Sequence, residues 1–137
     1  MHARHMHTRA VVTLLCCAAL TQASSLVAQP RSEEPETVMI TLHAKPGAES
    51  SLARVIERHW ETVRRLNMVT DAPHVTLRGT ENRDKTYFIE IMTWRDASVP
   101  DNAPPEILAL WKELNELVEP RNGQRGLDIT EMAIVAR

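Results

Sequence analysis

Residues 87–96 read YFIEIMTWRD, and this stretch decides the fold. Its aromatic and β-branched residues predict a β-strand. Alternate side chains of a strand point to opposite faces of a sheet. Glu90 therefore lies on the same face as Phe88, Met92 and Trp94. A carboxylate among three large apolar neighbours fits neither a solvated surface nor a dry core, so this face is the first place to look for a site.

The flanking sequence predicts three further strands and two helices. Alternation predicts strands over 37–44, 74–79 and 127–136. Apolar residues at helical spacing predict one helix over about 48–68 and another from Pro104 or Pro105 to Pro120. The order β-α-β-β-α-β predicts a ferredoxin-like α+β domain, with a four-stranded antiparallel sheet and both helices on one face.

The two faces of this sheet differ in their expected partners. Matching aliphatic positions across the hairpin places Val75 and Leu77 with Ile89 and Ile91, on the face that the helices cover. The uncovered face is then predicted to carry Met39, Thr41, His43, His74, Thr76, Arg78, Phe88, Glu90, Met92 and Trp94. An exposed apolar patch of this kind indicates an interface or a ligand groove. We expect a two-fold homodimer through this face, with Glu90 lining its cavity.

Glu90, with His43 or His74, is the predicted acid–base group, because burial raises the pKa of a carboxyl group toward neutrality. The alternative is a cross-strand ion pair between Glu90 and Arg78. The predicted ligand-binding residues are Trp94, Phe88, Met92, Arg78, Met39 and Thr76. The register of the fourth strand is not fixed by the pattern, so the side on which Glu131 lies stays open.

A metal site is not predicted, although two histidines and a carboxylate are suitable ligand types. His43 ends one strand and His74 begins another, and no closely spaced pair such as HxH is present. The sequence has no GxSxG, P-loop or GxGxxG motif, so no nucleotide cofactor is expected. A net charge of −2 for the whole chain disfavours nucleic acid as a partner.

The first residues are expected to form a secretory signal peptide. Arg4 and Arg9 flank the start of a short apolar run, and small residues follow it. The predicted organisation is a signal peptide over 1–28, a flexible lead-in over 29–36 and one domain over 37–137. Both cysteines, Cys16 and Cys17, lie in the apolar run. We expect a cysteine-free mature protein in the periplasm or secreted, with no membrane attachment after cleavage; the alternative is an uncleaved anchor.

Two features resemble the antibiotic biosynthesis monooxygenase-like (ABM) superfamily of dimeric α/β barrel proteins. They are the first strand followed by KPG and a long helix, and FIEIMTWRD, whose tryptophan precedes the second helical region. The resemblance covers about 37–136 and implies dimers whose sheets pack face to face. The superfamily includes cofactor-independent oxygenases of aromatic polyketides, haem-degrading enzymes and proteins without known activity.

The resemblance does not extend to haem. Trp94 matches a tryptophan that haem-degrading members place against the cofactor. Those members also use an asparagine on the first strand and a histidine on the second helix, and this chain has neither there. We therefore expect no cofactor. Two functions remain open: a cofactor-independent monooxygenase or related enzyme on a planar, partly apolar substrate, or a non-catalytic ligand-binding or structural dimer.

Overall fold

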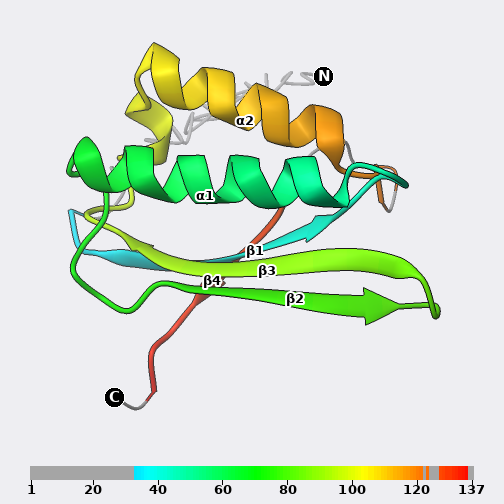
Figure 1. Ribbon diagram of the computed structural model, residues 1–137. Helices are drawn as coiled ribbons and strands as arrows, with labels where there is room; N and C mark the ends of the chain where they lie inside the picture. The colour runs from blue at the N-terminus through cyan, green and yellow to red at the C-terminus, as the bar shows by residue number, and fades with distance from the viewer. Residues whose placement is uncertain (1–32, 122, 124–126, 136–137) are drawn as a thin grey trace, which may run out of the picture.

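A computed structural model describes residues 33–121, 123 and 127–135 of the chain. The elements are β1 (Glu36–His43), α1 (Glu49–Arg65), β2 (Val75–Glu81), β3 (Lys85–Trp94), the 3-10 turn η1 (Pro100–Asn102), α2 (Pro105–Leu117) and β4 (Asp128–Met132). The strands form one antiparallel sheet in the order β2-β3-β1-β4, with both helices on one side (Figure 1). The predicted ferredoxin-like α+β fold is confirmed. The expected signal peptide, residues 1–28, lies outside the described residues.

Local sequence explains where the helices begin. Gly47 has a φ of +81°, a conformation that glycine adopts without a steric cost, and α1 starts two residues later. Pro105 occupies the first turn of α2, where its missing N–H costs no hydrogen bond. Among the described residues, no helix is long and apolar enough to span a bilayer.

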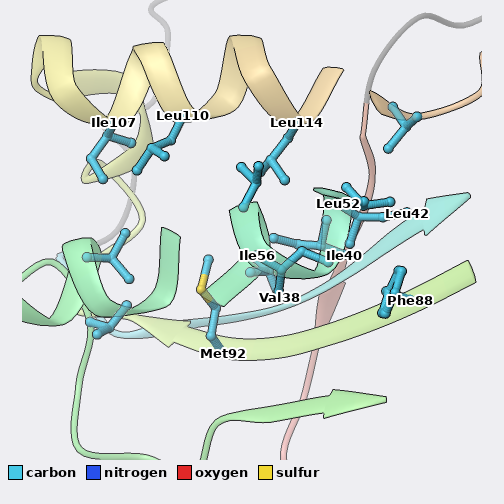
Figure 2. Close-up of a cluster of buried hydrophobic side chains, with 14 of the residues drawn as sticks. Val38, Ile40, Leu42, Leu52, Ile56, Phe88, Met92, Ile107, Leu110 and Leu114 are labelled. Carbon is cyan, nitrogen blue, oxygen red and sulfur yellow. The ribbon is translucent and has the colours of Figure 1, made fainter. Parts of the chain in front are cut away.

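The hydrophobic core fills the space between the sheet and the helices. Figure 2 shows Met92 rising from β3 toward the helices, while Ile107, Leu110 and Leu114 project from α2. The sheet contributes Val38, Ile40, Leu42, Phe88 and Met92, and α1 contributes Leu52, Val55, Ile56 and Val63. The packing neighbour of α2 is mainly α1 rather than the sheet.

The predicted assignment of sheet faces is wrong for β2 and β3. Ile40 pairs with Glu90, and directly paired residues of an antiparallel sheet point to the same side. The face under the helices therefore carries Val38, Ile40, Leu42, Phe88, Glu90, Met92 and Trp94. The uncovered face, called here the open face, carries Met39, Thr41, Tyr87, Ile89, Ile91, Val75 and Leu77. The prediction failed because β3 is apolar on both sides, so aliphatic matching chose the wrong one.

The chain beyond β4 leaves the body of the domain. Residues 133–135 continue past the sheet on the side away from the helices (Figure 1). Ile134 and Val135 are exposed there. The described C-terminal end of the chain therefore lies on the same side as the open face.

Candidate active site

Glu90 lies at the centre of β3 and is only 1 % exposed. Its Oε1 atom is 2.9 Å from Nε2 of His74, just before β2. Its Oε2 atom is 3.6 Å from Nδ1 of His59, which descends from α1 and is also 1 % exposed. A buried carboxylate is stable only with such partners. The fold therefore encloses Glu90 between two histidines.

His59 also accepts a hydrogen bond from α2. The indole Nε1–H of Trp111 donates to Nε2 of His59 across 3.1 Å. An indole N–H can only donate, so this histidine nitrogen carries no proton. The proton of a neutral His59 is therefore on Nδ1, which faces Glu90. The result is a chain of groups from Trp111 through His59 and Glu90 to His74.

Aromatic stacking fixes the position of His74. Its ring lies parallel to that of Trp60 on α1, with centroids 3.7 Å apart and an interplanar angle of 10°. The guanidinium of Arg64 lies 5.7 Å from the Trp60 ring centroid. Thr76 Oγ1 lies 3.3 Å from the same His74 nitrogen that contacts Glu90. Stacking on one side and these polar contacts on the other hold His74 against the carboxylate.

The electrostatics of Glu90 differ from the prediction. Burial raises the pKa of its carboxyl group, but the favourable interactions of the ionised carboxylate with His59 and His74 outweigh it, so the pKa lies below its ordinary value. Glu90 is therefore ionised at neutral pH and is a weaker base than predicted. Its carboxylate oxygens face these two histidines, whereas the predicted partner Arg78 has an exposed side chain.

A groove lies beside this network, between α2 and the β1–β4 half of the sheet. Its volume is about 500 Å³. The rings of Trp94 and Trp111 both line it, with centroids 6.5 Å apart and planes at 77° to each other. The other lining residues are Glu36, Val38, Ile40, Pro100, Asp101, Asn115, Leu127, Ile129 and Glu131. Two large rings beside a few polar groups form a site suited to a flat, partly apolar molecule.

The fourth strand contributes a carboxylate to this groove. Glu131 pairs with Val38, so it faces the helices rather than the open face. This register settles the question that the sequence left open. The Glu131 side chain lines the groove, whereas Glu90 does not. Glu90 is connected to the groove through His59 and Trp111. The groove and the buried network therefore meet at Trp111.

The structure divides the predicted site residues among different places. His74 and Thr76 lie near Glu90, as predicted, but on the helix side of the sheet. Phe88 and Met92 are core residues. Arg78 lies on the same face of the sheet, but on the edge strand β2, where its side chain is exposed. Trp94 alone of the predicted ligand-binding residues lines the groove.

His43 and Met39 lie on the open face, and the predicted pairing of His43 with Glu90 is wrong. His43 Nδ1 lies 3.2 Å from Oε1 of Glu81, at the far end of the hairpin. A hydrogen bond from Arg121 lowers the pKa of Glu81, and the charge of His43 acts in the same direction. His43 thus belongs to a separate group of charged residues.

A larger hollow, of about 900 Å³, lies at one end of the open face. Val75, Ile91, Thr93 and Met132 are among its lining residues. The oxygens of Thr37 and Thr93 hydrogen-bond to each other at 2.9 Å. We place the candidate site in the smaller groove, because the larger hollow contains neither a tryptophan nor a member of the Glu90 network.

Three residues of the site were not predicted from the sequence: His59, Trp60 and Trp111. Each lies on a helix, where an apolar pattern by itself indicates only packing. A usable signal was present, since His59 occupies the apolar stripe of α1 while Glu90 occupies the apolar stripe of β3. Within the described part of the chain, no group of three or more histidines, cysteines or carboxylates could hold a metal ion.

Comparison with solved structures gives several neighbours of the same fold. A mutant of SnoaB, a cofactor-independent oxygenase from Streptomyces nogalater, superposes with a TM-score of 0.57 at 16% identity, over 76% of this chain and 96% of that one. Rv0793 from Mycobacterium tuberculosis has a TM-score of 0.57 at 15% identity, over 76% and 98%. A structure described as antibiotic biosynthesis monooxygenase has a TM-score of 0.54 at 16% identity, over 74% and 99%.

The chain has an ABM-like fold. No protein-family model matches the sequence, and no curated protein matches it in sequence. Because the ABM-like neighbours share so few identical residues with the chain, they show its fold and leave its chemistry to its own residues. The ABM-like fold agrees with the resemblance found in the sequence.

Proposed function

We propose that this protein is a cofactor-independent monooxygenase, or a closely related small-molecule enzyme, acting on a planar, partly apolar substrate in the groove. The observation that carries the proposal is the pair of nearly perpendicular rings, Trp94 and Trp111, that line a groove together with the carboxylate of Glu131. The fold that the chain shares with an oxygenase that needs no cofactor supports it. Flat aromatic molecules stack well on such rings.

The proposed reaction converts an activated methylene group into a carbonyl group. A carboxylate, for which we propose Glu131, accepts a proton from the methylene and leaves a delocalised carbanion. The carbanion gives its electrons to O₂ and forms a hydroperoxide at the same carbon. Loss of water leaves the carbonyl, so CH₂ and O₂ become C=O and H₂O. The substrate supplies every electron, and no external reductant is required.

Two variants test this proposal with anthrone as substrate and acridone as a flat, neutral ligand that lacks a methylene. Glu131→Gln is expected to bind acridone normally and to lose at least about tenfold in the rate of anthrone oxidation. Asn115→Phe should fill the groove and weaken both acridone binding and anthrone oxidation. Leu108→Phe is the matched control, because Leu108 is on α2 but outside the groove. Anthrone oxidation that Glu131→Gln and Asn115→Phe leave unchanged would contradict the proposal.

The second candidate is a ligand-binding protein without chemistry. The observation in its favour is the closed Glu90 network, whose carboxylate is ionised, buried and outside the groove. A buried network of this kind can have a purely structural role, in which it makes the core rigid. Acridone binding with no oxidation of anthrone or of related hydroxyanthrones would favour this function.

We further propose that the protein acts as an exported homodimer whose subunits meet at their open faces. The exposed aliphatic residues on that face support the dimer, and the residues that resemble a signal peptide support export. N-terminal sequencing of the protein recovered outside the cytoplasm tests export. A mature chain that begins at Gln29 is expected, and an intact leader would contradict it.

A further inference from the structure

The groove and the buried carboxylate network share one residue, Trp111. Its ring lines the groove, and its N–H donates to Nε2 of His59 at 3.1 Å. On its other side, His59 faces Glu90, with 3.6 Å between His59 Nδ1 and Glu90 Oε2. We propose that His59 is a positioning residue: its Nδ1–H tautomer, set by Glu90, holds the Trp111 ring as the groove wall, so ligand affinity follows the protonation state of His59. This inference rests on the proposed function for its ligand.

The contacts of His59 select one tautomer of its ring. Nε2 of His59 must be free of hydrogen to accept from Trp111. Nδ1 of His59 and Oε2 of Glu90 are both buried and face each other, and neither has a closer hydrogen-bond partner in the described structure. A proton on Nδ1 is the arrangement that lets a donor face the carboxylate oxygen. Glu90 thus orients His59 without touching the groove.

Trp111 is held by two kinds of contact, ring packing and a hydrogen bond. Its ring packs edge-on against Trp94 at 6.5 Å, and the Trp94 ring also lies edge-on to His59 at 6.4 Å. Edge-on ring contacts orient Trp111 less sharply than a hydrogen bond does. The hydrogen bond to His59 supplies the directional restraint. The position of the groove wall therefore depends on one acceptor nitrogen.

Protonation of His59 would break its contact with Trp111. A second proton on His59 would occupy Nε2 and point at the indole N–H, so the acceptor is lost and two donors face each other. The titratable groups facing His59 are Glu90 from β3 and, behind that carboxylate, His74 before β2. From α2 the facing group is the Trp111 indole, which is not a titratable group. Protonated His59 is drawn to Glu90, and Trp111 is released from the wall.

The experiment combines nitrogen-15 NMR of the full chain with acridone binding over a pH series. The ring nitrogens of His59 should report an unprotonated Nε2 and a protonated Nδ1. The Trp111 indole resonance, assigned with Trp111→Phe, should shift as His59 gains its second proton. Acridone affinity should fall by about tenfold over the same pH range, the size expected when one buried donor loses its acceptor.

Three variants separate a positioning role from a structural one. His59→Gln offers an amide oxygen to Trp111 and an amide N–H to Glu90, so it should keep the affinity and lose the pH response. Trp111→Phe keeps a ring but has no N–H, and it should bind weakly at every pH. His43→Gln is the matched control on the open face and should leave the pH response intact.

Several outcomes overturn the inference. They are an Nε2–H tautomer, a Trp111 resonance that does not move as His59 titrates, a His59 that stays neutral until the protein unfolds, and a His59→Gln variant with an unchanged pH response. If acridone does not bind but the Trp111 resonance follows His59, the proposed function fails while the positioning of Trp111 stands. The two proposals are therefore distinguishable.

Discussion

Glu90 and His59 are polar residues in apolar stripes, one on a strand and the other on a helix. The Glu90 carboxylate buried alone would be an uncompensated charge, which costs on the order of 3–5 kcal/mol. Because the helix lies over the strand, the two atoms that need partners face each other. His74, held by Trp60, satisfies the second carboxylate oxygen. The network thus ties α1 to both strands of the hairpin.

The lowered pKa of Glu90 makes stability depend on pH in a defined direction. A carboxyl group whose pKa is lower in the folded state stabilises the protein above its ordinary pKa of about 4.3, and this contribution is lost as pH falls through the folded value. We expect Glu90→Gln to lower the free energy of unfolding by about 1–3 kcal/mol at neutral pH. The difference from the wild type should shrink below pH of about 4. Urea unfolding across this pH range measures it.

Glu113→Gln is the control for this prediction, because Glu113 forms an exposed ion pair with Arg58 that contributes little to stability. A Glu90→Gln penalty that stays constant from neutral to acidic pH would show that the carboxyl group is not stabilised in the folded state.

At the level of single residues, the sequence identified only part of the site. Glu90 and Trp94 were singled out because a carboxylate and an indole stand out on a strand. His59 and Trp111 were not connected to them, since a helix pattern tells which residues face inward but not which strand residue they meet. The direction of the Glu90 pKa shift was also beyond the sequence, because it depends on contacts with two histidines from distant segments.

At the scale of elements, the β2–β3 hairpin depends on a glycine. Gly79 pairs with Tyr87, and a Cβ atom at Gly79 would overlap the Tyr87 ring. The bare backbone of β2 thus makes room for an aromatic ring on the open face. Tyr87 in turn lies 5.7 Å from the ring of His43 on β1. This ring connects the three neighbouring strands at one end of the sheet.

We expect Gly79→Ala to lower the free energy of unfolding by about 1–3 kcal/mol, because the added methyl group displaces the Tyr87 ring. Chemical denaturation monitored by circular dichroism measures this loss. Thr80→Ala, at the next and exposed position, should change stability by less than about 0.5 kcal/mol. Equal effects of both substitutions would mean that Tyr87 relaxes freely.

Most of the elements were predicted closely, because each has a clear period and a turn signal at its ends. The predicted 37–44 and 48–68 correspond to β1 and α1, and the hairpin differs by a few residues. The faces of β2 and β3 were wrong because Ile89 and Ile91 are as apolar as Phe88 and Met92. Pairing with β1, which periodicity does not reveal, decides between them.

At the scale of the whole molecule, the open face is expected to be a subunit interface. Leu77 is 52% exposed there, and Leu108 on α2 is 51% exposed on the opposite side. We expect the wild type to be a dimer by native mass spectrometry and Leu77→Lys to be monomeric, because a buried lysine disfavours the interface. Leu108→Lys should stay dimeric. A monomeric wild type would rule out the proposed interface. If Leu77→Lys and Leu108→Lys were both dimeric, the subunits would meet at another surface.

Residues 133–135 pass beyond the sheet on the side of this proposed interface (Figure 1). Their path matters to anyone who fuses a reporter or an affinity tag to the chain. If the open faces form the proposed interface, a fusion at the C-terminus would compete with the second subunit for space. A fusion before residue 29 would be removed with the leader if that segment is cleaved. The polar hairpin tip over residues 82–84 lies away from the groove and is the better place to insert a short epitope.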